Sequence, residues 1–257
     1  MSSTSLTEQI VLITGGGKNL GAALARRFAE QGVAGLALHY HSAASRAEAE
    51  QTAAEIQQRG TPVLLVQADL RQPAAIAELF SQTKLKFGRI DSAINTVGMV
   101  LKKPILEISE AEFDAMLAIN TKSAFFFLQQ AGHYLADGGK ICSLTTSLLG
   151  AFTGYYSSYA GAKAAVEHYT RAAAKEFAAR RISVTSVAPG PMDTPFFYAQ
   201  ESAEAVTYLS KAAALSPYTA SGLTEVRDIV SLINYLITDG WWMTGQTLLA
   251  NGGFTTK

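Results

Sequence analysis

Residues 11–21 read Val-Leu-Ile-Thr-Gly-Gly-Gly-Lys-Asn-Leu-Gly, an apolar start that runs into a glycine-rich turn. A helical pattern follows directly, over residues 20–31. Glycines between a first strand and a helix let backbone amides approach a pyrophosphate, whose negative charge the helix dipole favours. A plain tight turn would use the same glycines, but the strand before and the helix after favour dinucleotide binding. The candidate cofactor-binding residues in this turn are Gly15, Gly17, Lys18, Asn19, Leu20 and Gly21.

Short apolar segments alternate with longer helical patterns along the rest of the chain. Strands are expected at residues 10–13, 36–39, 63–68, 90–95, 140–144, 182–187 and near 247–250. Helices are expected at 20–31, 44–59, 74–87, 122–135, around 159–179 and at 226–237. Strand-then-helix alternation is typical of βαβ units, whose strands form a parallel sheet. We therefore predict an α/β chain with a parallel sheet of about seven strands.

The composition favours one globular domain with a small-molecule partner. A chain of 257 residues with 48% hydrophobic residues can bury a sizeable core, so we expect a single domain over residues 1–257. Basic and acidic residues balance at 21 each, which leaves no electrostatic footprint for nucleic acid or an anionic membrane surface. A small, neutral or mildly charged partner fits this balance better.

The single cysteine and the start of the chain bear on cellular location. Cys142 lies in an apolar stretch, so we expect a buried structural thiol and no internal disulfide. Residues 1–9 are polar and lack the charged and apolar regions of a secretory signal. No apolar run approaches the ~20 residues that a membrane span needs. A soluble, cytoplasmic protein is therefore expected.

A second stretch, Tyr159-Ala160-Gly161-Ala162-Lys163, begins a segment whose composition favours helix. Residues four apart share one face of a helix, so the phenol and the ammonium would lie on the same side. Tyrosine has an ordinary pKa of about 10, and a neighbouring cation favours the phenolate and lowers that pKa. The pair would make a proton donor and acceptor, although Tyr and Lys at this spacing also occur on solvated helix faces.

The glycine turn and the Tyr-Lys pair resemble motifs of the short-chain dehydrogenase/reductases, and the likeness extends over residues 10–253. The resemblance implies an NAD(P)-dependent oxidoreductase. It also implies a Rossmann-like doubly wound parallel sheet with helices on both faces, in three layers α/β/α. Asn19 is a departure, because the family has the middle glycine of its turn there. Pteridine reductases of the same family also carry another residue at that place, and residues 39–44 resemble their cofactor loop.

The second strand ends in Leu-His-Tyr-His-Ser, without an acidic residue. In dinucleotide-binding folds an Asp or Glu at this point hydrogen-bonds the ribose of NAD, whereas NADP needs a site free of negative charge with a cation nearby. Lys18, and after it His41 or Arg46, could supply that cation. We therefore expect NADP(H) rather than NAD(H), with His39, Tyr40 and His41 at the cofactor. Alternatively the histidines merely end a strand; their spacing has no zinc pattern, so no metal is expected.

Two further segments resemble adenosine-side motifs of the family. Asp69 and Leu70 follow the third strand, where the family has an aspartate beside the adenine ring, and Asp69 is equally suited to cap the next helix. Residues 94–98, Ile-Asn-Thr-Val-Gly, resemble the family's Asn-Asn-Ala-Gly with two departures. The resemblance implies a structural role for Asn95 as much as a ligand role. The implied cofactor residues are Asp69, Leu70, Asn95, Thr96 and Gly98.

An asparagine and a hydroxyl complete the implied catalytic set. Asn120 opens a long helix and resembles the family's asparagine, whose carbonyl holds a water that links the lysine to solvent; read alone, it is a good N-cap. The family places a serine thirteen residues before its tyrosine, where the hydroxyl steadies the substrate oxygen. Counting back from Tyr159 gives Thr146, whereas Ser147 lies three residues before Gly150 as the family's serine often does. Either hydroxyl can donate to a carbonyl oxygen, and we lean to Ser147 for its chemistry.

After the sixth strand, residues 187–194 resemble the family's Pro-Gly segment, where backbone groups and a threonine meet the nicotinamide carboxamide. Two prolines and a glycine would also suit a plain loop. Residues 191–222 correspond to the family's mobile substrate flap, and their aromatic side chains suggest a flat or apolar substrate. The implied cofactor residues are Pro189, Gly190, Met192 and Thr194.

Apolar side chains in two places suggest self-association. Residues 125–128, Phe-Phe-Phe-Leu, look like interface or core residues, and they belong to a helix that commonly packs against its copy in another subunit of this family. Trp241 and Trp242 precede the last strand, at a place where family members often contact neighbouring subunits. A surface or core role fits them at least as well as contact with a substrate. A homo-oligomer, either a tetramer or a dimer, is therefore expected.

The motif set implies hydride transfer between the C4 of a nicotinamide and the carbonyl or alcohol carbon of a small molecule. In reduction Tyr159 would donate the proton, and Lys163 would lower its pKa and hold the nicotinamide ribose. Ser147 or Thr146 would orient the oxygen, and Asn120 would keep the proton path hydrated. Two other functions stay open. One is pteridine reduction, which the cofactor loops suggest, and the other is a dinucleotide-binding sensor without turnover.

Overall fold

The computed structural model describes residues 5–256; residues 1–4, part of the polar segment 1–9, and residue 257 lie outside the described part. Within residues 5–256 there are seven strands: β1 (Ile10–Thr14), β2 (Gly35–Tyr40), β3 (Val63–Gln67), β4 (Ser92–Asn95), β5 (Lys140–Leu144), β6 (Ser183–Pro189) and β7 (Thr247–Ala250). They form one sheet in the order β3-β2-β1-β4-β5-β6-β7, in which every neighbouring pair is parallel. All the strands expected from the sequence are confirmed.

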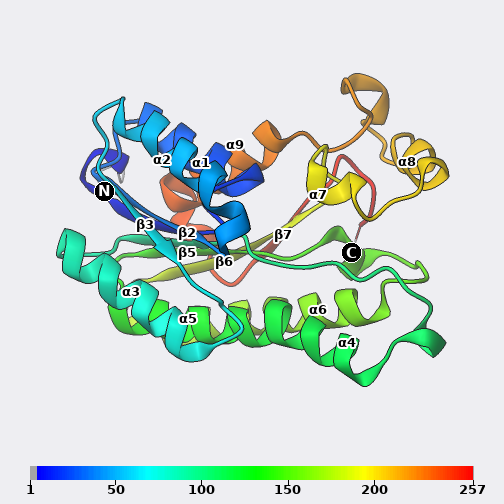
Figure 1. The fold of residues 1–257 in the computed structure, drawn as a ribbon, viewed down its shortest axis with the longest axis horizontal. Coiled ribbons are helices and arrows are strands. Elements are labelled where there is room, and N and C mark those ends of the chain that lie inside the picture. The colour runs from blue at the N-terminus through cyan, green and yellow to red at the C-terminus, as the bar shows by residue number, and fades with distance from the viewer. Residues whose placement is uncertain (1–4, 257) are drawn as a thin grey trace.

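Helices cover both faces of the sheet. They are α1 (Asn19–Glu30), α2 (Arg46–Gln57), α3 (Pro73–Phe87), α4 (Glu110–Met116), α5 (Ser123–Tyr134), α6 (Ser157–Glu176), α7 (Pro195–Tyr198), α8 (Ala203–Leu209) and α9 (Val226–Ile237). Figure 1 shows α1, α2 and α9 on one face and α3, α5 and α6 on the other. This three-layer arrangement, with the strand order reversing beside β1, is a Rossmann-like doubly wound fold.

Strand β1 lies in the middle of the sheet and has a core on each side. Val11 and Ile13 belong to the core cluster that contains Leu24 of α1, whereas Leu12 belongs to the cluster that contains Phe127 of α5. Because both faces are buried, the strand reads as an unbroken apolar run rather than an alternation. In such sheets ligands bind outside the carboxyl ends of the strands, where the strand order reverses.

The helix expected at residues 122–135 begins earlier than its pattern indicated. Helix α4 continues through a π-helical turn, Leu117–Lys122, directly into α5. The true start is a capping box in which the Ser109 hydroxyl accepts from the Glu112 N–H. Asn120 lies inside this long helix with 1% of its surface exposed, so its interpretation as an N-cap is wrong.

Cys142 on β5 is fully buried, and burial raises the pKa of its thiol to about 12, which confirms the expected structural role. None of the helices formed by residues 5–256 has the length and apolar character needed to cross a membrane. In the described part of the chain, no three His, Cys, Asp or Glu side chains gather in a way that could hold a metal ion.

Candidate active site

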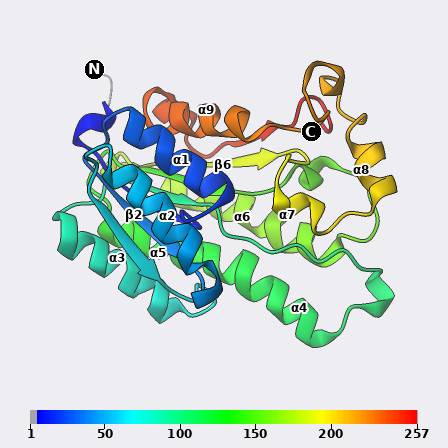
Figure 2. The same cartoon turned by 45° about the horizontal axis from the view of Figure 1, so that its top comes forward.

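A cavity of about 650 Å³ lies beyond the carboxyl ends of the strands. Its walls come from the turn after β1, from the ends of β2, β4, β5 and β6, and from α6 and the flap of residues 191–222. Figure 2 shows α7 and α8 past the carboxyl end of β6, where they cover this edge of the sheet. All the site residues expected from the sequence line the cavity except Asp69, Asn95 and Asn120.

The glycine turn keeps its shape although Asn19 replaces a glycine. Asn19 has a φ of 48°, in the left-handed region that asparagine tolerates better than most residues. Gly21 is required sterically, because a Cβ there would lie 2.1 Å from the carbonyl oxygen of Gly15. Lys18, at the N-cap of α1, makes no side-chain hydrogen bond to the first turn, so the turn and the helix amides fit an anionic phosphate.

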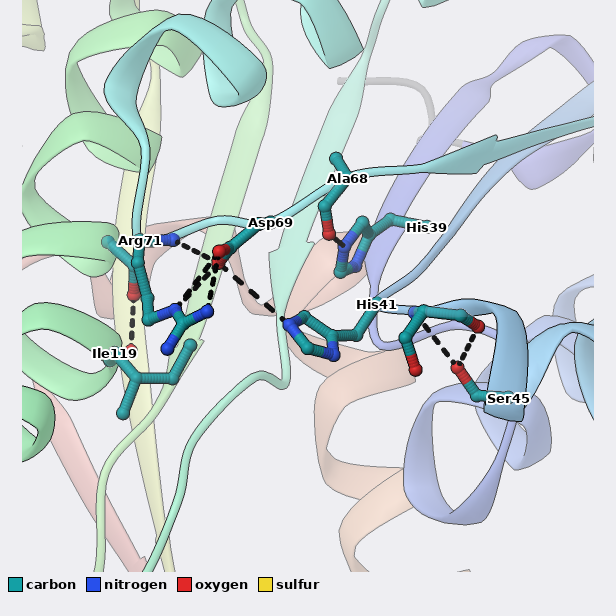
Figure 3. A network of polar contacts seen from close by, with 9 residues as sticks. His39, His41, Ser45, Ala68, Asp69, Arg71 and Ile119 are labelled. Carbon is teal, nitrogen blue, oxygen red and sulfur yellow. Dashed lines mark hydrogen bonds and ion pairs between the residues drawn. The ribbon is translucent and has the colours of Figure 1, made fainter.

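His39 fixes the glycine turn from the end of β2. Its Nδ1 accepts a hydrogen bond from the Gly15 N–H at 3.1 Å, and its Nε2 donates to the Ala68 carbonyl at 2.9 Å. Figure 3 shows the second of these contacts. Accepting at Nδ1 requires a neutral ring, and burial lowers the pKa of His39 to about 4. His39 is therefore a neutral link between the first three strands and cannot serve as a cation.

Asp69 contacts two basic side chains, Arg71 and His41, at the end of β3. It does not cap α3, whose N-cap is Gln72. Arg71 donates to its carboxylate from the backbone N–H, from Nε and from Nη2, the last at 2.7 Å, and these hydrogen bonds lower the pKa of Asp69. His41 Nε2 lies 3.9 Å from the same carboxylate, and both side chains point towards it in Figure 3. Arg71 lines the cavity, and no sequence motif pointed to it.

The other candidate cations also have carboxylate partners. Lys18 Nζ lies 3.8 Å from a Glu48 oxygen at the rim of the cavity. Arg46 hydrogen-bonds Glu50 on its own helix at 2.7 Å and does not line the cavity. The sequence argument considered only the end of β2, whereas α2 and β3 bring carboxylates to the same place.

Asn95 acts inside the sheet rather than at the cavity. Its Oδ1 accepts hydrogen bonds from the Thr14 hydroxyl at 2.7 Å and from the Val97 N–H at 3.2 Å. Asn95 therefore ties β1 to β4 at the position where the strand order reverses. These contacts support the structural role expected for Asn95.

Tyr159 and Lys163 lie one turn apart on α6, and both are buried. Burial raises the pKa of Tyr159 to about 12, against a smaller opposing effect of a hydrogen bond with Thr146. Lys163 Nζ donates instead to the carbonyls of Leu144 at 2.9 Å and Val97 at 3.3 Å, and burial lowers its pKa to about 8. The expectation that Lys163 lowers the pKa of Tyr159 is wrong for the chain by itself. At neutral pH the phenol holds its proton.

The two candidate hydroxyls both line the cavity at the end of β5. The Thr146 side chain hydrogen-bonds Tyr159 and also accepts from the Leu148 N–H at 3.3 Å. Ser147 is held by its backbone carbonyl, which accepts from Thr255 Oγ1 at 3.0 Å. The contact with the phenol favours Thr146, the residue that counting from Tyr159 indicates, over Ser147.

Asn120 supports the site from behind Lys163. Its Nδ2 donates to the Met99 carbonyl at 2.9 Å, and its Oδ1 accepts from the Met99 N–H at 3.1 Å. A Cβ on Gly98 would lie 2.9 Å from Asn120 Oδ1 and 3.0 Å from Lys163 Nζ. A glycine at position 98 therefore lets the lysine and the asparagine meet the loop after β4. Helices often carry π-turns at functional sites, and this one places Asn120 at the loop.

The flap forms part of the cavity wall, in the half away from the glycine turn. Phe196 and Phe197 of α7 line the cavity, whereas Tyr198, Tyr208 and Tyr218 do not. Only part of the flap's aromatic content therefore meets a substrate. The sequence did not indicate the helices α7 and α8, nor did any motif indicate the polar side chains that share this half of the cavity.

Comparison with known proteins agrees with the fold and the motifs. A family model described as enoyl-(acyl carrier protein) reductase matches residues 15–255. A dehydrogenase from Burkholderia cenocepacia, solved with bound NADP, is 57% identical with a TM-score of 0.98, over 100% of this chain and 97% of its own. The short chain dehydrogenase/reductase AacuN of Aspergillus aculeatus is 31% identical over 96% of both chains.

A plant relative has the same extent of similarity. The chloroplastic NADPH-dependent aldehyde reductase-like protein of Arabidopsis thaliana is 32% identical over 97% of this chain and 95% of its own length. The matches run along almost the whole chain, as the order of the motifs does. The chain therefore belongs to the short-chain dehydrogenase/reductase family and is an oxidoreductase.

Proposed function

We propose that the protein is an NADP(H)-dependent enzyme that reduces a carbonyl group of a small molecule or oxidises the corresponding alcohol. The observation that carries the proposal is the protonated, buried phenol of Tyr159 beside the Thr146 hydroxyl, in one cavity with the glycine turn. The cofactor supplies a hydride to the carbonyl carbon and accepts it in the reverse direction. The NADP and NADPH named for two of the similar proteins support the choice of cofactor.

The proposed catalytic side chains bind the carbonyl oxygen of the substrate or transfer the proton that this oxygen receives. Tyr159 donates its phenolic proton to the carbonyl oxygen as the carbon receives the hydride, which leaves an alcohol and a phenolate. The Thr146 hydroxyl orients the oxygen by donating a hydrogen bond to it. Lys163, with a pKa of about 8, holds the ribose of the nicotinamide and supplies the proton that restores the phenol. Asn120 holds the neighbouring loop against the lysine.

The cofactor end of the cavity fits an anionic dinucleotide. The turn of residues 15–21 and the uncapped start of α1 would hold the pyrophosphate. Lys18, His41 and Arg71 would meet the additional phosphate of NADP, in competition with the carboxylates of Glu48 and Asp69. We expect kcat/KM for NADPH to exceed that for NADH by at least about tenfold. Equal use of the two cofactors would contradict this part of the proposal.

Turnover is the direct test of the function. NADPH consumption is followed with phenanthrenequinone, benzaldehyde and ethyl acetoacetate, which sample flat, aromatic and aliphatic carbonyl compounds. Consumption that depends on the carbonyl compound is expected. NADPH binding without turnover of any compound in a wide panel would instead favour the dinucleotide-binding sensor.

Pteridine reduction is tested in the same assay with dihydrobiopterin. The segments that resemble pteridine reductases, residues 18–21 and 39–44, lie at the cofactor end of the cavity or on the adjoining loop. The resemblance in these segments therefore indicates how the cofactor binds and does not indicate the substrate. We expect no turnover of dihydrobiopterin; turnover at a rate above those of the carbonyl compounds would make pteridine reduction the better assignment.

We further propose that the chain forms a homo-oligomer, a dimer or a tetramer. Phe125 on α5 is 45% exposed and packs edge to face against Phe126 and against Tyr169 of α6. Trp242 is 81% exposed in a separate place. Exposed apolar clusters of this kind favour contact with another subunit. Light scattering coupled to size exclusion should give a mass of two or four chains, and Phe125→Ser should reduce it; a monomer would contradict the proposal.

A further inference from the structure

Tyr156 and Glu201 line the substrate half of the cavity and form, with Lys102, a cluster of polar side chains that the mechanism above does not use. Glu201, in the flap between α7 and α8, lies at its centre, and only 4% of its side chain is exposed. One carboxylate oxygen accepts a hydrogen bond from Lys102 Nζ, and the other accepts from the Tyr156 hydroxyl. The carboxylate is therefore buried, paired with a cation and hydrogen-bonded at both oxygens.

The three residues come from three separate parts of the fold. Lys102 follows β4, Tyr156 is the N-cap residue of α6, and Glu201 belongs to the flap. Lys102 Nζ also lies 5.6 Å from the centre of the Tyr156 ring, at a distance where a cation is attracted to an aromatic face. The cluster thus joins the flap to the loop after β4 and to the start of α6.

Glu201 makes the polar connection between this part of the flap and the rest of the protein. Among the described residues, the hydrogen bonds of residues 195–210 stay within residues 193–212, apart from the two that Glu201 accepts. Loss of the Glu201 contacts would therefore release this part of the flap.

Tyr156 differs from Tyr159 in the group to which its hydroxyl donates a hydrogen bond. Tyr156 lies one helical turn before Tyr159 and also lines the cavity. Its hydroxyl donates to Glu201, and burial together with that carboxylate raises its pKa well above the usual range. The Tyr156 phenol is therefore occupied as a donor and leaves the substrate oxygen to Tyr159.

We propose that Glu201, held by Lys102 and Tyr156, fastens residues 195–210 of the flap over the substrate and so acts as a positioning residue for the reaction. Its contribution to turnover rests on the proposed oxidoreductase function. Its contribution to the position of the flap does not, so the two are measured separately.

Flap position is measured by hydrogen–deuterium exchange of peptides that cover residues 199–210. Lys102→Met removes the ion pair, and Tyr156→Phe removes one oxygen atom with little risk to folding. Lys103→Met is the matched control, because Lys103 Nζ hydrogen-bonds Glu112 on α4 at 2.9 Å. We expect exchange in the flap to rise at least about fivefold in the two cluster variants and to stay unchanged in the control.

Turnover is measured on the same variants with NADPH and phenanthrenequinone. We expect kcat/KM for phenanthrenequinone to fall at least about tenfold in both cluster variants, because the substrate is no longer held under a closed flap. The Kd for NADPH should stay within about twofold, since the cluster lies in the substrate half of the cavity. A loss of NADPH binding equal to the loss of kcat/KM would overturn the positioning role.

Exchanging the charges of Lys102 and Glu201 distinguishes a specific effect of their ion pair from a general loss of stability. Lys102→Glu and Glu201→Lys should each release the flap, and the double variant should restore much of the protection, because it rebuilds the pair with opposite signs. Wild-type exchange in the single variants, or no recovery in the double variant, would refute the proposal. If the wild type reduces no carbonyl compound, the oxidoreductase assignment fails while the exchange measurements still decide the role of Glu201.

Discussion

His39 should make the stability of the fold depend on pH in a way that one substitution removes. The ring is buried, accepts from the Gly15 N–H and donates to the Ala68 carbonyl. His39→Gln is the informative change. A glutamine amide offers an acceptor and a donor to the same two groups but does not titrate.

The magnitude follows from the pKa of His39, which burial lowers from 6.5 to about 4. Between these values the unfolded chain binds a proton that the folded chain does not, so stability rises with pH through this window. The contribution is complete above the unfolded pKa and is lost as the pH falls towards 4. At about 1.4 kcal/mol per pH unit, the full window corresponds to roughly 3 kcal/mol.

The assay is urea unfolding of wild type and His39→Gln at constant protein concentration, at several pH values between about 7 and about 4.5. Other titrating groups are common to both proteins, so they cancel in the difference between the two curves. The free energy of unfolding of the wild type should fall more steeply on acidification, by up to about 1.4 kcal/mol per pH unit. Parallel curves, or a steeper fall in the variant, would refute the neutral, buried histidine.

Three further predictions concern the catalytic end of the cavity. Thr146→Val should lower kcat by about 100-fold to 1000-fold, whereas Ser147→Ala should lower it less than about fivefold; equal losses would contradict the assignment of Thr146. Gly98→Ala should lower kcat/KM at least about tenfold, because its Cβ would lie 3.0 Å from Lys163 Nζ. Gly161→Ala is the control, because its Cβ would meet open space. Similar values of kcat/KM for the two alanine variants would contradict this steric explanation. Lys163→Met should weaken NADPH binding by about 10-fold to 100-fold in a fluorescence titration, and an unchanged Kd would exclude a role for the lysine at the cofactor.

Local patterns were sufficient to predict most of the elements. The last helix, Val226–Ile237, and the last strand, Thr247–Ala250, have the bounds that the sequence indicated. Both follow from a hydrophobic periodicity that depends on neighbouring residues alone. The glycine turn was predictable for the same reason, since strand, glycines and helix are contiguous.

Predictions failed where the outcome depends on tertiary placement. Asn120 has the chemistry of an N-cap, but the capping box at Ser109 starts the helix earlier and a π-turn carries Asn120 into the interior. The pKa of Tyr159 rises because burial outweighs its neighbours, and Lys163 turns its ammonium to backbone carbonyls at the strand ends. Sequence spacing places two residues on one helix face but does not determine which groups their side chains contact.

Other site residues carried no signal in the sequence at all. Glu201 meets Lys102 across 99 positions of the chain, and such a contact has no local periodicity or motif. Arg71 is only two residues from the predicted Asp69, yet its place in the cavity depends on how the loop after β3 turns. Contacts of this kind become visible only in the folded structure.

The central claim is that the phenol of Tyr159 gives its proton to the substrate oxygen. Its most direct test is NADPH consumption with a carbonyl substrate by wild type and Tyr159→Phe, with NADPH binding measured on both proteins. We expect the variant to bind NADPH within about threefold of the wild type and to lose at least about 100-fold in kcat, because the general acid is absent. A Tyr159→Phe enzyme that reduces the carbonyl compound at the wild-type rate would contradict the account.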